Sequence, residues 1–325
     1  MDQKKIEYDN CPVFLKDFLF YLETIVGRSK KTVYEYYLDI RTFLRFMLIY
    51  KDLSPLDVDF NQIDISNFSI DVLKGITLSD VYEYMHYISS ERGNINGTRA
   101  RKVSSLKGLY KYLSLKSNYN IANPLENLEM PAIRKSLPKY LSLEQSIQVL
   151  ESVDGPYKER DFCILTLFLN CGMRVSELVG INIQDIREDS IRILGKGNKE
   201  RILYLNQACV QAIEEYIAVR PKDIKEKKAL FVSRNGNRIH VRRVQQIVEI
   251  TLKKVGLDGQ GYSTHKLRHT AATLMYQYGD VDIRVLKEIL GHEAITTTEI
   301  YTHVSNKQLE AAAAKSPLSN IKRKK

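Results

Sequence analysis

The chain has 325 residues, of which 44% are hydrophobic and 27% are charged, a balance typical of a folded protein of about two domains. This composition excludes a disordered polymer and a collagen-like repeat, and we expect no membrane span, because no apolar run approaches about 20 residues. We also expect no secretory leader, because the N-terminal MDQKKIEYDNCPVF has no long apolar h-region. The 49 Lys and Arg outnumber the 39 Asp and Glu and leave a net charge of +10, which favours a polyanionic partner such as nucleic acid.

Helical spacing of apolar side chains predicts a small helical domain over residues 1–117. Its four predicted helices cover residues 11–26, 30–48, 77–90 and 98–116. Ser29 is the expected N-cap of the second helix, because a hydroxyl there accepts from a free backbone N–H. Residues 51–76 are acidic and broken, so we predict a loop-rich insertion there.

Basic side chains cluster at the starts of two of these helices. Lys30 and Lys31 open the second helix, and Arg99, Arg101 and Lys102 open the fourth. A helix N-terminus with added Lys and Arg suits a phosphate group, so these five residues are the candidate DNA contacts of the N-terminal domain. The alternative for each of them is a solvated helix end.

Asn and Pro residues between 118 and 138 predict a linker, and a second domain follows over residues 139–325. Ser142 and Gln145 form an expected capping box, and Gly172 is expected to end or to kink a buried helix. The further predictions are helices at 160–171, 176–179, 208–219, 241–255, 264–278, 281–290 and 296–301, a hairpin at 190–205 and a strand at 230–232. The fold class is therefore mainly α, with one small β-hairpin in the second domain.

Several familiar catalytic patterns are absent from the sequence. It holds no GxxxxGK[ST], and Thr296 stands where an HExxH motif that begins at His292 would need its second His. His265 and His269 have the i,i+4 spacing of a zinc pair, but no third ligand follows at suitable spacing. The four Cys form no CxxC pair and are expected as reduced, buried thiols. We therefore expect no metal, no other cofactor and no ATP site.

A spaced set of basic and polar residues remains, and its order is specific. The set is Arg174 in CGMRVSEL, Lys196 in LGKGNKER, His265 and Arg268 in STHKLRHTAAT, His292 in LKEILGHEAITTT, and Tyr301 in EIYTHV. This pattern of Arg, Lys, His-x-x-Arg, His and Tyr resembles the tyrosine recombinases, also called the phage-integrase family. The segment NPLENLEMPAIRKSLPKYLSLEQ and the four-helix N-terminal part are similar to the Xer recombinases, whereas the acidic stretch 51–76 and the alanine-rich end depart from them.

The chemistry of such a set follows from its side chains. A phenol that attacks a phosphodiester keeps the bond energy in a protein–DNA ester, so rejoining needs no ATP. Tyr301 is the candidate nucleophile, and its ordinary pKa of about 10 requires nearby positive charge or a base. Arg174 and Arg268 suit the transition state, because each guanidinium stays protonated and donates two hydrogen bonds to phosphate.

The resemblance implies the remaining site roles. Lys196 would be the general acid for the leaving 5′-hydroxyl, on the tip of the hairpin. His265 would accept the Tyr301 proton or assist the reverse step, and His292 would hydrogen-bond the phosphate. Glu177 is expected as a structural partner of the site.

The resemblance also implies the partners. A core-binding (SAM-like) N-terminal domain and a catalytic domain would clamp a double-stranded recombination site in the cytoplasm, at the nucleoid. A helix-prone segment after Tyr301 would dock in trans within a homo- or hetero-tetramer on two DNA sites, with a second recombinase or a DNA translocase as further partners. Resolution of chromosome dimers is the leading expectation. An integrase or conservative transposase of a mobile element, a type IB topoisomerase and an inactive DNA-binding protein are the alternatives.

Overall fold

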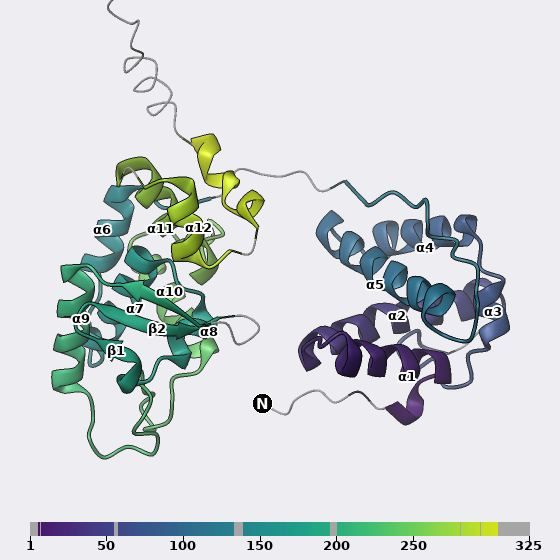
Figure 1. Ribbon diagram of the computed structural model, residues 1–325, viewed down its shortest axis with the longest axis horizontal. Helices are drawn as coiled ribbons and strands as arrows, with labels where there is room; N and C mark the ends of the chain where they lie inside the picture. Colours follow the sequence, from purple (N-terminus) through teal and green to yellow (C-terminus); the bar gives the residue numbers. More distant parts are fainter. Residues whose placement is uncertain are drawn as a thin grey trace, which may run out of the picture. The chain divides into compact units, whose positions relative to one another are not determined.

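The computed structural model describes Ile6 and residues 8–54, 58–132, 139–195, 200–279, 281–292 and 294–304. It divides into two compact units, Met1–Lys135 and Ser136–Lys325 (Figure 1). Helices dominate both units and one small sheet lies in the second, which confirms the predicted fold class. None of the helices within the described ranges is both long enough and apolar enough to cross a membrane.

The four predicted helices of the first unit are confirmed, with small shifts at their ends. The elements are a 3₁₀ turn Tyr8–Asn10, α1 Val13–Phe20 continued by a π-helical turn Tyr21–Ile25, α2 Lys30–Tyr50, α3 Ile70–Lys74, α4 Leu78–Ser90 and α5 Asn96–Leu115. Ser29 caps α2 as predicted, because its hydroxyl accepts from the Thr32 N–H at 3.2 Å. Helix α2 packs against α1, α4 and α5 around one apolar core.

Two segments outside the four predicted helices also contribute to this core. The acidic stretch 51–76 supplies α3 and buries Ile65, Phe68 and Leu73, although its sequence has no helical or strand period over its length. Residues 118–132, which lie in the expected linker, bury Ile121, Leu125 and Leu128 against the same core. Isolated apolar residues among Asp, Asn and Ser can therefore anchor a segment that has little regular structure.

A buried carboxylate joins α2 to α5 in the first unit. Asp39 is 1% exposed and accepts hydrogen bonds from Arg101 Nη1 at 2.6 Å, Ser105 Oγ at 2.9 Å and Lys102 Nζ at 3.2 Å. These three groups therefore compensate the charge of the buried Asp39 carboxylate, as a buried ion requires. Burial lowers the pKa of Lys102, and the Asp39 charge opposes that effect.

We expect Asp39→Asn to destabilise the first unit by about 1–3 kcal/mol, because the amide keeps one acceptor oxygen but leaves the buried Lys102 ammonium without a counter-charge. Hydrogen exchange of peptides from α2 and α5, followed by mass spectrometry, measures this loss. Asp71→Asn is the matched control, since Asp71 pairs with Lys74 while 79% exposed and should change stability by about 0–1 kcal/mol. Equal effects of the two substitutions would contradict the assigned role of Asp39.

The second unit is built around α7. Its helices are α6 Leu143–Glu151, α7 Lys158–Cys171, α8 Val175–Gly180, α9 Gln207–Val219, α10 Val241–Lys254, α11 Thr264–Tyr278 and α12 Ile283–Leu290. Its strands are β1 Ile186–Arg187, β2 Ser190–Leu194 and β3 Glu200–Tyr204, and its 3₁₀ turns are Ile183–Asp185, Ile295–Thr297 and Glu299–Val304. Helix α7 contacts α6, α9, α10 and α11, so it is buried on most sides, and after its charged first turn its sequence is mostly apolar (Figure 1).

The local signals in this unit are confirmed with two exceptions. One is the predicted helix 296–301, where the structure has two 3₁₀ turns, Ile295–Thr297 and Glu299–Val304. Ser142 and Gln145 form the predicted capping box, and β2 and β3 form the predicted hairpin within an antiparallel sheet of order β1-β2-β3. The predicted strand 230–232 was wrong. Leu230 and Phe231 are buried, but this segment makes single bridges rather than a ladder, one of them between Val232 and Arg238. Its apolar run reflects burial without strand pairing.

Candidate active site

A tight turn between α7 and α8 positions Arg174. Gly172 ends α7 as predicted, with a left-handed φ of 59°, and a Cβ at this position would lie 2.9 Å from Leu290 Cδ2. Arg174 is the N-cap of α8, and its backbone N–H donates to Glu177 Oε2 at 2.8 Å while its Nη1 donates to Glu177 Oε1 at 2.8 Å. Both the backbone and the guanidinium of Arg174 are therefore fixed by one carboxylate.

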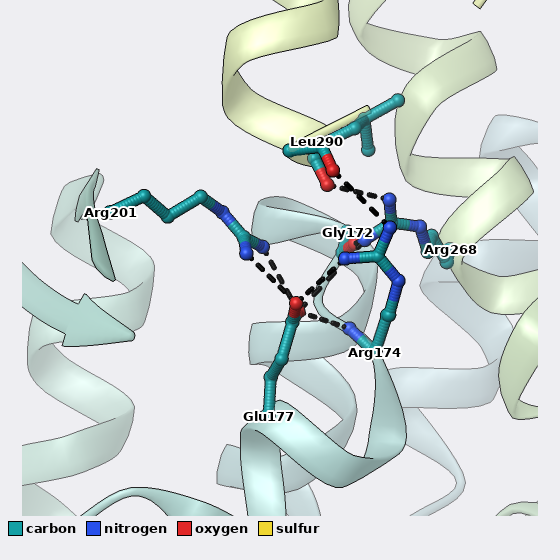
Figure 2. Close-up of polar contacts among 7 residues, drawn as sticks. Gly172, Arg174, Glu177, Arg201, Arg268 and Leu290 are labelled. Carbon is teal, nitrogen blue, oxygen red and sulfur yellow. Dashed lines mark hydrogen bonds and ion pairs between the residues drawn. The ribbon is translucent and has the colours of Figure 1, made fainter. Parts of the chain in front are cut away.

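The same carboxylate binds a second arginine from the sheet (Figure 2). Glu177 is 5% exposed, and Arg201 on β3 donates to both of its oxygens, at 2.8 and 2.9 Å. Burial by itself raises the pKa of Glu177, but the hydrogen bonds and charges of Arg201 and Arg174 outweigh it and hold that pKa below its usual range. Glu177 is thus an ionised bridge between α8 and β3.

Arg268 brings α11 to the same place. It is 3% exposed, and it donates from Nη1 to the Gly172 carbonyl at 2.7 Å and from Nη2 to the Leu290 carbonyl at 2.6 Å. Arg174 Nη2 donates to the next carbonyl, that of Gly291, at 3.3 Å. Burial and the nearby Arg174 charge lower the pKa of Arg268 to about 10, so it still carries its charge at neutral pH. The two guanidiniums share the end of α12 (Figure 2).

His292 follows that helix end directly. Its Nδ1 lies 2.9 Å from Thr298 Oγ1, a contact that closes the loop leading to the last 3₁₀ turn. Burial lowers the pKa of His292 to about 4, and the charges of Arg268 and Arg174 act in the same direction. His292 is therefore a neutral imidazole beside two cations in this state of the protein.

Tyr301 lies in the last described 3₁₀ turn and is 1% exposed. Its ring packs with Ala272, Leu286 and Leu290, and its hydroxyl lies 2.8 Å from Nδ1 of His269 on α11. Burial raises the pKa of Tyr301 to about 12, and the Arg268 charge opposes that rise. The phenol is therefore protonated and hydrogen-bonded at neutral pH.

Of the other two predicted catalytic residues, the structure describes His265 but not Lys196. His265 is exposed at the start of α11, one turn before His269, and the two imidazole centroids are 4.6 Å apart. Burial of part of the ring lowers the pKa of His265, and the charges of Arg268 and Lys266 add to this effect. Lys196 lies outside the described residues.

The five candidate DNA contacts of the first unit differ in exposure. Lys30 and Lys31 are exposed at the start of α2. Arg99 is half-buried and donates to Ser89 Oγ at 2.7 Å. Arg101 is exposed, although it pairs with Glu35 and Asp39. Lys102 is buried against Asp39 and is turned inward.

Sequence reasoning missed two residues that the structure brings into this site. Arg201 sits on the face of β3 that carries the buried Leu203, and a charged residue on the inward face of a strand was the available signal. His269 lies one turn after His265 and next to Arg268, but its spacing from His265 indicates a zinc pair rather than a partner for the phenol. Within the described ranges, no group of three or more His, Cys, Asp or Glu side chains could hold a metal ion.

Comparison with known proteins gives four findings. Residues 139–308 match the model of the phage integrase family. The chain is 50% identical over 309 residues to a tyrosine recombinase XerC of Caldanaerobacter subterraneus subsp. tengcongensis, and the matched region covers 95% of this chain and 88% of that protein. Its fold is similar to that of the XerH site-specific recombinase bound to palindromic difH substrate in a post-cleavage complex, with a TM-score of 0.68, 23% identity and coverage of 96% and 98%. It is also similar to that of lambda integrase in a tetramer bound to a Holliday junction, with a TM-score of 0.63, 16% identity and coverage of 91% and 84%.

Proposed function

The chain belongs to the phage integrase family as a tyrosine site-specific recombinase of the Xer type, and from this premise we propose that it resolves chromosome dimers by cutting and rejoining DNA through a 3′-phosphotyrosine. The unit Met1–Lys135 is proposed as the core-binding domain and Ser136–Lys325 as the catalytic domain. One observation carries the proposed chemistry. The charged guanidiniums of Arg174 and Arg268 both bind carbonyls at the end of α12, and Tyr301 follows that helix end after a short stretch of chain, about as many residues as three helical turns contain.

Arg174 and Arg268 are proposed to bind the non-bridging oxygens of the scissile phosphate. Their present hydrogen bonds to carbonyls and to Glu177 support this role, because they hold both planar groups in place before the substrate arrives. Tyr301 Oη is proposed to bond to phosphorus while the bond from phosphorus to the 5′-oxygen breaks. Since Tyr301 is buried, we infer that the segments covering its hydroxyl move aside when DNA binds.

The proton transfers complete the proposed reaction. Lys196 would protonate the departing 5′-oxygen, and His292, neutral and beside both arginines, would hydrogen-bond the phosphate. His265 is proposed to exchange a proton with the reacting oxygens; its exposure supports access to the substrate. In the second half of the reaction, a 5′-hydroxyl attacks the phosphotyrosine and releases the Tyr301 phenol.

The proposed DNA interface of the first unit rests on Lys30, Lys31, Arg99 and Arg101 at the starts of α2 and α5. Their cationic ends would bind the phosphate backbone and fix the register of the domain on a duplex. Lys102 was expected in the same role, but its ammonium is bonded inward to Asp39, so we assign it to the support of Arg101 instead.

A tetramer on two DNA sites is the proposed assembly, and the fold shared with a lambda integrase tetramer on a Holliday junction supports it. The segment proposed to dock on a neighbouring protomer begins after residue 304 and lies outside the described residues. A second recombinase or a DNA translocase would be a further partner, and the proposed place of action is the nucleoid in the cytoplasm.

Three measurements test this function. Chromatin immunoprecipitation of the native protein should enrich one locus near the replication terminus, whereas enrichment at the ends of a mobile element would favour an integrase. A nicked duplex that carries the recovered site should then trap a covalent adduct, and mass spectrometry of the digested adduct should find a nucleotide on the peptide that contains Tyr301. A modified residue elsewhere in the chain would contradict the mechanism. Relaxation of a one-site plasmid without exchange between two sites would favour a topoisomerase.

A further inference from the structure

The phenol of Tyr301 has a hydrogen-bond partner that the family pattern of six residues does not contain. His269 Nδ1 lies 2.8 Å from the Tyr301 hydroxyl, and the two rings are 5.6 Å apart between centroids. His265, to which the sequence pattern gave the phenolic proton, is exposed one turn away on α11. The two histidines therefore face different surroundings, one the phenol and the other the solvent.

The contact has the donor and acceptor that a proton transfer from the phenol needs. Burial lowers the pKa of His269 to about 4, with the His265, Lys266 and Arg268 charges acting in the same direction, so the ring is neutral at neutral pH. A neutral ring that carries its proton on Nε2 offers a lone pair at Nδ1, and the phenol, with a pKa of about 12, donates to it. Nucleophilic attack by Tyr301 requires removal of this proton.

We propose that His269 holds the Tyr301 phenol before cleavage and takes its proton as Oη attacks phosphorus. This inference rests on the proposed function of the site. The Oη–H bond breaks and a bond from Nδ1 to that hydrogen forms; Oη bonds to phosphorus, and the 5′-oxygen leaves with the electron pair and is protonated by the general acid. The histidinium returns the proton when the phosphotyrosine is resolved. His265 is then left for the phosphate side of the reaction.

The surroundings of His269 allow its basicity to rise when DNA binds. The groups that act on it or lie against it are His265, Lys266 and Arg268 from α11, Tyr301 from the last 3₁₀ turn and His292 from the loop after α12. Four of these five are cationic or become so on protonation, and they disfavour a histidinium in the free protein. A bound phosphate brings negative charge beside them and favours the protonated ring.

The test asks whether the effect of removing the His269 base depends on how readily the phenol at position 301 loses its proton. His269→Asn places an amide near the position of Nδ1, so it keeps a hydrogen-bonding group but removes the base. The variant is made with Tyr301 and also with 2,3,5-trifluorotyrosine at position 301, whose phenol loses its proton far more readily. The rate of covalent adduct formation on the nicked duplex is measured under single-turnover conditions, and DNA affinity is measured separately. His265→Asn is the matched comparison on the same helix.

With Tyr301 in place, we expect His269→Asn to slow adduct formation by about 10²-fold or more at unchanged DNA affinity, and the trifluorotyrosine background to reduce that factor below about tenfold. The loss in His265→Asn should not be relieved in this way. An equal factor in both backgrounds, or a rate within about threefold of the wild type, would overturn the inference. A wild-type protein that forms no adduct at all would instead refute the proposed function, so the two failures are distinct.

Discussion

Tyr301→Phe is expected to bind its recombination site with the affinity of the wild type and to form no covalent adduct with it. The substitution removes the oxygen that would bond to phosphorus and keeps the ring that packs with Ala272, Leu286 and Leu290. Denaturing electrophoresis of a labelled nicked duplex detects the adduct, and a native gel-shift measures the affinity. An adduct that persists in Tyr301→Phe would mean that another residue is the nucleophile.

The fold should tolerate this change. Loss of the hydroxyl leaves His269 Nδ1 without the phenol, at a cost of about 1–3 kcal/mol, which is smaller than the stability of most domains. Tyr278→Phe is the matched control, because Tyr278 ends the same helix as His269 and its side chain is exposed. That control should cleave like the wild type, so a loss in both variants would indicate a defect in the preparation rather than in the nucleophile.

Glu177→Gln is expected to destabilise the second unit by about 3–5 kcal/mol, because it removes the charge that Arg201 and Arg174 share. The amide keeps the size of the side chain, but it offers one acceptor oxygen where the carboxylate offers two. Hydrogen exchange in peptides from α8 and β3 measures the loss. Adduct formation should fall as well, since Arg174 would no longer be held at the end of α12.

The stabilising effect of the Glu177 carboxylate should depend on pH in a definite direction. The pKa of Glu177 is lowered in the folded protein, so its ion pairs contribute fully above the ordinary pKa of a glutamate, about 4.3, and the contribution is lost as the pH falls through the lower folded value. The difference in stability between the wild type and Glu177→Gln should therefore be constant near neutral pH and should shrink in acid.

Glu200→Gln separates this effect from general charge loss. Glu200 begins the same strand that carries Arg201, but it is exposed, and its carboxylate lies 3.6 Å from Arg192 Nη1. Its substitution should change stability by about 0–1 kcal/mol. If Glu177→Gln were as mild as this control, or if its effect did not diminish in acid, the bridge between α8 and β3 would not have the energetic role assigned to it.

Local signals in the sequence predicted most helices of both units, because their apolar period and caps are written in neighbouring residues. The prediction of α11 as Thr264–Tyr278 is confirmed at both ends. The prediction of a strand at 230–232 was wrong, since burial alone produces the same apolar run as a paired strand. The core contribution of residues 51–76 was also missed, because it depends on side chains without a common period.

The candidate site shows the same division between local and distant information. A motif in the sequence identified Arg174, Arg268, His292 and Tyr301, and the structure brings them around the end of α12. No local pattern could pair Arg201 with Glu177 across 24 positions, and no spacing rule could decide which histidine of α11 meets the phenol. Those contacts depend on how strands and helices pack, which a single sequence does not reveal.

The end of α12 imposes a constraint on the evolution of this site. Leu290 and Gly291 offer successive carbonyls to the two guanidiniums, and the chain then continues to Tyr301, the proposed nucleophile. A single-residue insertion or deletion within Ile283–Leu290 would turn these carbonyls by about 100° around the helix axis and would aim both away from their arginines. Amino-acid replacements on the outer side of α12 are compatible with activity, but its length is not free to drift, so indels should accumulate in other segments of homologous chains.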